Sequence, residues 1–245
     1  MSSLRLGIAL LLAALPLRAQ EISTTIVPVV GSVFGASMAR WLTDVELVNE
    51  GALDVDVAIE LPSVPVSAPL FFTLSPGQSQ RFTDIVGQAF GLEHALSPLR
   101  VTSSSRRGVT VRAQAYAVTA AGISSPQRID VYQDSTYFPV RVLDGLAFSD
   151  NYRTNVGLVN VGEQSADFLL ALQRIPGRNV AVTHMRVNPG SVVHVAIQAL
   201  FPLITSGNGF SIVIETNARD THVYGSVIES STSSARFITP RVGAR

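Results

Sequence analysis

The sequence contains no cysteine and no lysine, and it is poor in charged and aromatic side chains. Without cysteine, the chain has neither a disulfide framework nor a lipid-modified cysteine. All 18 basic residues are arginines, scattered singly apart from Arg106-Arg107, and 18 acidic residues balance them. Nucleic-acid binding needs clustered cations, so we expect no nucleic-acid partner. Hydrophobic residues make up 47% of the 245, enough for a sizeable core.

The first 19 residues have the layout of a secretory signal peptide. Arg5 supplies the positive start, an apolar run covers Leu6 to Leu15, and cleavage is expected after Ala19. The mature chain then carries a net charge of about −2. No run reaches the ~20 apolar residues that a spanning helix needs, so we expect no membrane span after cleavage. The layout predicts export to a bacterial periplasm or cell exterior.

Period-two alternation of apolar and polar residues predominates after Thr24, and helical periodicity is rare. Turn signals recur every ~8–12 residues, a spacing typical of antiparallel β-sandwiches. Pro28 places the first strand at a sheet edge in this interpretation. An up-and-down barrel is the lower-ranked alternative, because it does not need the proline-rich edge segments. In the first half we expect strands at 24–30, 38–49, 55–61, 70–74, 78–82, 99–103 and 109–118, a turn at 31–36, and a short helix at 84–90.

One strand motif occurs twice. Trp41–Gly51 and Tyr152–Gly162 share an aromatic-x-Thr start and an Asn-x-Gly end, 111 residues apart. Phe138-Pro139-Val140 likewise matches Val27-Pro28-Val29. Asn188-Pro189-Gly190 matches Ser75-Pro76-Gly77. A copy this long, with insertions confined to loops, indicates an internal duplication.

We therefore expect two tandem β-sandwich domains, repeat 1 at 20–133 and repeat 2 at 134–245, each with one short helix. The last two strands of each repeat are predicted to form a hairpin, 99–103 with 109–118 and 210–216 with 221–228. The strand at Thr136–Val142 either closes the first domain or opens the second. Residues 120–127 form either a linker or a long hairpin loop.

The repeated strand also predicts which side chains are buried. Trp41, Thr43, Val45 and Leu47 share the core face, and Leu42, Asp44, Glu46 and Val48 share the solvated face. Trp41 aligns with Tyr152, which suggests a shared packing role. Leu42 aligns with Arg153, so the two copies have in common mainly the buried face and the turn.

On these strands, the Pro-Gly turns and the terminal Phe237-Ile238-Thr239-Pro240, the chain resembles uncharacterised exported bacterial proteins with tandem immunoglobulin-like β-sandwich repeats. The resemblance covers nearly all of the mature chain. It implies immunoglobulin-like domains and carries no catalytic residues.

Four histidines are candidates for a metal or catalytic site: His94, His184, His194 and His222. A zinc site needs three convergent ligands, and no ligand-spacing motif is present. Arg81 of the first copy stands opposite His194. We interpret the histidines as strand residues and expect no metal and no cofactor.

Other chemistry finds little support in the sequence. Gly190-Ser191 and Gly225-Ser226 lack the second glycine of a hydrolase nucleophile elbow. No Gly-rich loop precedes a helix, so phosphate binding is not expected. The acids, which paired could hydrolyse glycosides, are expected on solvated faces or loops: Glu46, Asp54, Asp56, Glu163 and Asp167.

Calcium and carbohydrate are the remaining ligands to consider. Two groups could bind calcium weakly, Asp144 with Asp150 and Asn151, and Glu50 with Asp54 and Asp56, although neither forms a recognised calcium loop. Aromatic residues are only 7%, too few to predict a sugar platform.

We therefore expect an exported, non-catalytic structural, adhesive or protein-interaction module, with a protein or cell-surface polymer as partner and edge-strand pairing at the proline-bearing strands as its mechanism. The alternatives are a carbohydrate-binding accessory β-sandwich and a cryptic secreted hydrolase.

Overall fold

The computed structural model describes residues 22–35, 38–105, 109–133, 137–175 and 178–243. The expected signal peptide, Arg106-Arg107 and Thr136 lie outside these ranges. The described chain is all-β, with antiparallel sheets and two short helices, as the sequence predicts. No helix within these ranges is both long and apolar enough to cross a bilayer.

The first half contains ten strands in one sheet and a short helix between the fifth and sixth strands. The helix η2 follows Asp84, whose carboxylate accepts a hydrogen bond from the Gly87 N–H at 3.1 Å. The elements are β1 (Ser23–Phe34), β2 (Arg40–Asn49), β3 (Val55–Glu60), β4 (Leu70–Leu74), β5 (Ser79–Phe82), η2 (Ile85–Ala89), β6 (Ala95–Ser103), β7 (Val109–Thr119), β8 (Gly122–Ile123), β9 (Gln127–Ile129) and β10 (Tyr132–Gln133).

The second half forms two separate sheets of five and four strands. A one-turn helix, α1 (Ile197–Leu200), follows the fifth of its strands. The strands are β11 (Val140–Phe148), β12 (Tyr152–Asn160), β13 (Ala166–Ile175), β14 (Arg178–Val187), β15 (Ser191–Ala196), β16 (Gly207–Glu215), β17 (Thr221–Glu229), β18 (Ala235–Ile238) and β19 (Arg241–Val242).

The strands of the two halves pair in the same order. β4-β3-β6-β1 in the first half corresponds to β14-β13-β16-β11 in the second, and β5-β2-β7 corresponds to β15-β12-β17. Each half ends with a segment that crosses from its seventh strand to its first, β9 and β10 from β7 to β1, and β18 and β19 from β17 to β11. Among the described residues the halves differ in two respects. β1 pairs with β2, whereas β11 does not pair with β12, and β8, which pairs with β7, has no counterpart in the second half.

These pairings place the segments that the sequence left open. Val140 begins the first strand of the second half, and residues 127–133 complete the first half. Residues 120–127 form the β7–β8 hairpin and lead into β9, rather than a linker. Among the described residues, no strand ladder joins the two halves.

The hairpin predictions are wrong. β6 pairs with β1 and β3, and β7 pairs with β2, so these consecutive strands are not partners. β16 and β17 likewise lie in different sheets. Alternation shows which face of a strand is buried, but it does not identify the neighbour. Here the chain crosses to a distant position of the same sheet after β6 and to the other sheet after β16.

The prediction that Pro28 marks a sheet edge is also wrong. β1 lies in the interior of the sheet order, and the predicted turn at 31–36 is largely its continuation to Phe34. The register with β6 shifts between Val27 and Val30. Pro28 therefore occupies a bulge, where its missing N–H breaks no ladder bond.

The two Asn-x-Gly turns are built alike. The Asn49 amide donates to the carbonyls of Leu53 and Leu74, both at 2.8 Å, and its oxygen accepts from the Gly51 N–H at 2.9 Å. The Asn160 amide donates to the Gln164 carbonyl at 2.7 Å and the Val187 carbonyl at 3.1 Å, and its oxygen accepts from Gly162. Both side chains are fully buried. The motif therefore ties the end of the second strand to the turn that follows it and to the end of the fourth strand, β4 or β14.

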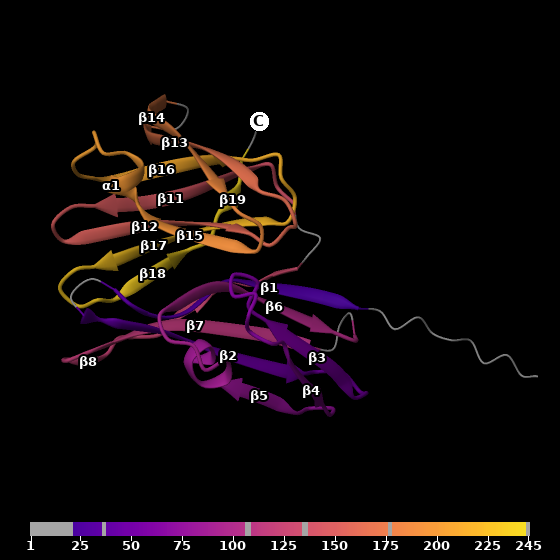
Figure 1. Ribbon diagram of the computed structural model, residues 1–245. Coiled ribbons are helices and arrows are strands. Elements are labelled where there is room, and N and C mark those ends of the chain that lie inside the picture. Colours follow the sequence, from indigo (N-terminus) through magenta and orange to yellow (C-terminus); the bar gives the residue numbers. More distant parts are fainter. Residues whose placement is uncertain (1–21, 36–37, 106–108, 134–136, 176–177, 244–245) are drawn as a thin grey trace, which may run out of the picture.

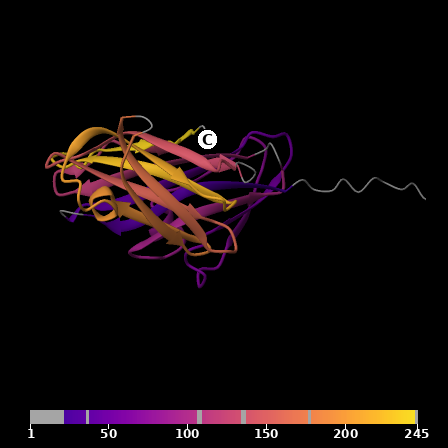
Figure 2. The same cartoon turned by 90° about the horizontal axis from the view of Figure 1, so that it is seen from above.

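The second half is stacked on the first (Figure 1). Sheet β15-β12-β17-β18 lies between sheet β14-β13-β16-β11 and the β1–β6 region of the first half, and the view from above shows the halves overlapping (Figure 2). Each half encloses its own apolar core. A third, smaller apolar cluster joins them, with Ile26 of β1 against Val159, Val161 and Tyr224.

Candidate functional site

The site with the most unusual chemistry lies where the two halves meet. Val156 and Leu158 of β12 face the core of the second half, so Asn155, Gly157 and Val159 face the first half. Polar contacts also join the halves there. The Arg100 guanidinium of β6 donates to the Val161 carbonyl at 2.8 Å and bonds Glu60 at 2.5 Å. The Ser63 hydroxyl donates to the Gly190 carbonyl at 2.8 Å.

Gly157 makes room for an aromatic ring on this face. It pairs across the ladder with Tyr224 of β17, and a Cβ at Gly157 would lie 2.0 Å from the Tyr224 ring. Tyr224 stacks on His194 and Phe237, with ring centroids 5.7 and 4.9 Å away. Its hydroxyl lies 2.9 Å from His194 Nδ1. Burial raises the pKa of Tyr224, so the phenol stays protonated and can donate to the imidazole.

A cavity of about 360 Å³ opens beside this cluster, between the two halves. We call it the interdomain cavity. Most of its surface is apolar. The first half contributes Val29, Gly31, Val33, Phe34, Gly35, Trp41, Leu42, Thr43, Leu96, Ala115, Gln127 and Ile129, and the second half contributes Arg153, Asn155, His194, Tyr224, Ser226, Ile228, Ala235 and Phe237.

Residues that align in the two copies of the repeated strand lie in different surroundings. Leu42 and Arg153, expected on a solvated face, both line the interdomain cavity and are half-buried. Trp41 also lines it, whereas Tyr152 is exposed and does not. The predicted shared packing role of Trp41 and Tyr152 is therefore wrong, because only the first copy places this position between the halves.

Among the described residues that line the cavity, Arg153 is the one with a permanent charge, and none is a carboxylate. Within the described residues, the Arg153 guanidinium has no ion pair and no hydrogen bond. It lies near His194, where desolvation by the surrounding protein, with a smaller contribution from the Arg153 charge, lowers the pKa of that histidine. Solvent still reaches the His194 side chain, which is exposed within the cavity.

The corresponding positions of the first half form an ion-paired network instead. Asp44 of β2 is bonded by Arg81 of β5, the Tyr116 hydroxyl and the Asp84 N–H, each at 3.1 Å. Burial, with a further contribution from the Asp44 charge, raises the pKa of Tyr116 to about 12. Asp44 is only 6% exposed, which corrects its expected place on a solvated face. Four hydrogen-bond donors satisfy the carboxylate, and this allows the charged side chain to be buried.

A second aromatic contact joins the halves at the other end of the same face. His222 of β17 is buried and stacks on Tyr132 of β10, with ring centroids 4.6 Å apart. Burial, aided by the Arg141 charge, lowers the pKa of His222 to about 3. Arg141 is also buried and donates to the hydroxyl and carbonyl oxygens of Thr221 at 3.2 and 2.6 Å. This arrangement holds a neutral imidazole against a phenol.

The remaining histidines lie elsewhere. His184 is exposed on β14, and His94 is exposed and packs against Phe34 in a tilted arrangement, with ring centroids 5.2 Å apart. Across the described ranges, no group of three histidine or acidic side chains is placed to hold a metal ion. His194 and His222 share one sheet face, whereas His184 lines a separate pocket together with Asp167 and Glu215.

The other predicted candidates are dispersed. Asp54, Asp56, Glu163 and Asp167 are exposed as expected, and Glu46 pairs with Arg112 at 3.2 Å. Ser191 donates to the Pro189 carbonyl, and Ser226 lines the cavity.

The two calcium groups do not converge. Asp144 lies within β11 and is bonded by Arg241 and Ser211, whose hydrogen bonds lower the pKa of its carboxyl in spite of partial burial. Glu50 faces Arg112 at 3.8 Å, and Asp56 accepts from Thr73.

Exposed aromatic rings are scattered over separate elements. Phe34 ends β1, Phe71 lies on β4, Phe138 precedes β11 and Tyr152 begins β12. Aromatic rings that bind sugars act as a shared platform, and these four do not share a strand.

Sequence reasoning missed Asn155, Gly157 and Tyr224 as parts of the site. The signal was present in the differences between the copies. Asp44 is replaced by Asn155, Glu46 by Gly157 and Arg81 by His194, so three charged positions on one sheet face of the first copy have lost their charge or been replaced by histidine in the second. This loss of charge fits the position of that face in the second copy, which lies against the first half.

No family model matches the sequence, and a search of curated proteins finds no significant match.

Proposed function

We propose that this protein is an exported, non-catalytic binding module made of two copies of one immunoglobulin-like β-sandwich. The observation that carries the binding proposal is the edge strand β14. It is ten residues long and ends the five-stranded sheet, so one side of its backbone pairs with no described strand. Open edges of this kind are the surfaces to which extended protein segments add as a further strand.

The side chains of β14 support an extended protein segment as the partner. Val182, His184 and Arg186 alternate along the outer face, Val180 lies at a register shift with β13, Arg178 lies beyond that shift, and all five are exposed. Val180 is 42% and Val182 52% exposed. Edge strands are usually protected by charge along their length, yet here the two central positions are apolar and the flanking positions are cationic or neutral. A strand that alternates apolar and acidic side chains complements this face.

The corresponding strand pairings of the two halves and their matched Asn-x-Gly turns support an internal duplication. The central pairings of the second half follow those of immunoglobulin-like sandwiches: β12 pairs with β15, β13 pairs with β16, and β13 forms a hairpin with β14. The first and last strands differ, since β11 pairs with β16 and β17 with β12. We therefore propose a related arrangement in which these two outer strands have exchanged sheets.

Export is proposed from the N-terminal sequence alone. If it is correct, protein recovered outside the cytoplasm begins at Gln20, and N-terminal sequencing of that material is the direct check. An intact N-terminus at Met1 on the recovered protein would refute cleavage.

The binding proposal is tested with an extended synthetic peptide that alternates valine and glutamate. Binding is followed by nuclear magnetic resonance, and we expect shifts of backbone amides concentrated on β14. The double variant Val180→Glu/Val182→Glu should weaken binding of the peptide at least about tenfold, because acidic side chains on the edge repel the glutamates of the peptide and resist strand addition. Val66→Glu adds the same kind of charge at a loop position that is 90% exposed, and it should bind like the wild type. Shifts centred elsewhere, or equal affinity in the double variant, would count against β14.

A further inference from the structure

The interdomain cavity has a composition that suits one class of ligand. Its walls are mainly aliphatic and aromatic, from Val33, Trp41, Leu96, Ile228 and Phe237 among others. Its volume of about 360 Å³ is at the lower end of the range typical of small-molecule sites, ~300–1,000 Å³. A small molecule with a mostly apolar body fits this space.

The charge of the cavity is as informative as its shape. Arg153 is half-buried, lines the cavity and has no carboxylate partner among the described residues. Removing a guanidinium from water without a counter-ion is costly. The neighbouring His194 supplies no compensating negative charge, since its Nδ1 is hydrogen-bonded to the neutral Tyr224 hydroxyl. The site therefore has an unmatched positive charge at its wall.

The first copy shows that the strand does not need a cation there. Leu42 stands at the position of Arg153, on the same cavity, and packs as an apolar residue. In the first copy, the acid two positions further along is Asp44, which Arg81 neutralises. In the second copy that acid is Asn155, so the arginine is present and the acid is absent. Folding alone does not account for this combination.

We propose that the interdomain cavity binds a small apolar monocarboxylate, with its carboxylate on the Arg153 guanidinium and its hydrocarbon body against Trp41, Leu96 and Phe237. The planar guanidinium matches a carboxylate in a bidentate pair. The Asn155 side chain offers a further hydrogen bond from the same strand face. Both halves line the site, so neither half contains it alone.

The chain carries its own probe of this site. Trp41 is the single tryptophan, and it lines the cavity. Entry of an apolar ligand should change its fluorescence. Octanoate is the test ligand, and octanol is the matched uncharged ligand. We expect a saturable change with octanoate and at least about tenfold weaker binding of octanol, because hydrogen bonds to charged groups contribute more than neutral ones.

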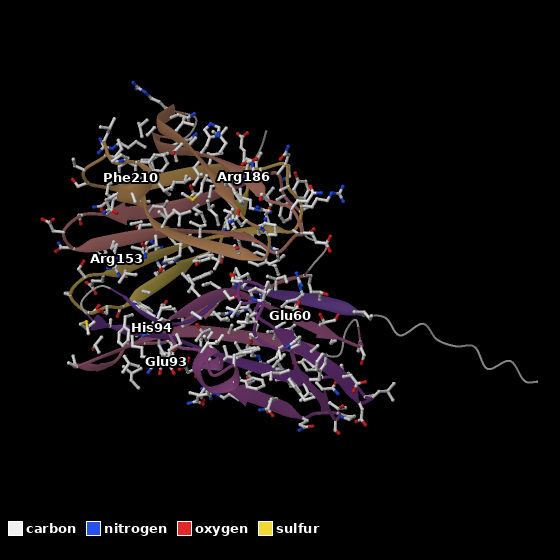
Figure 3. The ribbon with its side chains drawn as sticks, viewed as in Figure 1. Glu60, Glu93, His94, Arg153, Arg186 and Phe210 are labelled. Atoms are coloured by element: carbon white, nitrogen blue, oxygen red, sulfur yellow. The ribbon has the colours of Figure 1, made fainter. Side chains whose placement is uncertain are left out.

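Variants locate the carboxylate. Arg153→Gln should lower the affinity for octanoate at least about tenfold and leave the affinity for octanol unchanged. Arg186→Gln is the control, because Arg186 is exposed on β14, away from the boundary between the halves where Arg153 lies (Figure 3). Thermal unfolding of each variant establishes that it is folded. If Arg153→Gln does not fold, Ser226→Phe, which fills the cavity and keeps the arginine, should abolish binding of both ligands.

The proposal is overturned by three results. One is the lack of any saturable change up to about 1 mM octanoate, a concentration that corresponds to a weak site. Another is equal affinity for octanoate and octanol, which would make the cavity a non-specific apolar space. The third is unchanged octanoate affinity in the folded variant, Arg153→Gln or Ser226→Phe.

Discussion

Single buried amides hold the turn at the end of the second strand in both halves. Asn49 and Asn160 each satisfy backbone groups from two different segments, and both are inaccessible to solvent. An aspartate would lose the amide donors, and an alanine would lose every contact. The asparagine is therefore required by the backbone groups around it.

Removing either amide should strongly destabilise the protein. We expect Asn49→Ala and Asn160→Ala each to lower the free energy of unfolding by about 3 kcal/mol, because buried carbonyls and an N–H lose their partners. Asn208→Ala, at an exposed position of β16, should change it by less than about 0.5 kcal/mol. Urea unfolding measures all three. Equal small effects at the three positions would contradict this account of the turns.

His222 should make stability depend on pH. Its folded pKa of about 3 lies below the ordinary value of 6.5, so the unfolded chain takes up the proton first as the pH falls. Its contribution is complete above about pH 6.5 and declines as the pH falls toward about 3, by up to about 1.4 kcal/mol for each pH unit.

The variant His222→Phe keeps a ring against Tyr132 and removes this titration. Between pH 7 and 5, its free energy of unfolding should fall less steeply than that of the wild type. His184→Phe alters an exposed histidine and should retain the wild-type slope. Chemical unfolding at several pH values gives the slopes, and parallel slopes for His222→Phe and the wild type would refute the assignment.

At the scale of strands, the pairing of β12 with β17 depends on one glycine. Gly157 and Tyr224 are directly opposite, and the ring occupies the space that a side chain at 157 would fill. The Tyr224–His194 contact, and with it one wall of the interdomain cavity, follows from that vacancy.

Gly157→Ala should therefore destabilise the protein by about 2–3 kcal/mol, as expected for a buried overpacked site. Tyr224→Ala removes the obstructing ring, and we expect the double variant to be less destabilised than the sum of the two single changes by about 1 kcal/mol or more. Additive effects in a double-mutant cycle would show that the ring does not respond to residue 157.

The alternation of apolar and polar residues predicted most strands, including β4 at 70–74. The one short helix expected in each repeat corresponds to η2 and α1. It did not predict partners. β6 and β7 follow one another in the sequence but lie in different parts of the sheet order, because strand pairing is decided by packing between distant segments. Pro28 was misplaced for the same reason, since a bulge in an interior strand has the same local sequence as an edge.

At the scale of the whole molecule, the two halves share a small apolar cluster and a few polar contacts. Ile26, Val159 and Tyr224 are fully or almost fully buried between them. Residues of both halves form the candidate site, so it was not predictable from either repeat alone. The differences between Leu42 and Arg153 and between Arg81 and His194 are visible in the sequence, but their meaning depends on the position of the other half.

The variant Val159→Asp places an unpaired charge in this cluster and should separate the halves. We expect the calorimetric unfolding of the wild type to be one transition and that of the variant to split into two, because a buried charge without a partner costs several kcal/mol. Val159→Ala should retain a single transition at lower temperature. A single transition in Val159→Asp would mean that the halves do not unfold independently.

The ion pairs on the outer face of β5-β2-β7 have a further consequence. This face of the first half carries Glu46, Arg81 and Arg112, whereas its counterpart in the second half has Gly157 and His194 at the positions of Glu46 and Arg81 and lies against the first half. Head-to-tail addition of another molecule would have to desolvate those charges, at a cost that their attraction does not recover. We therefore expect that the arrangement joining the two halves is not repeated between chains, so that the stack stops at two members instead of growing into a filament.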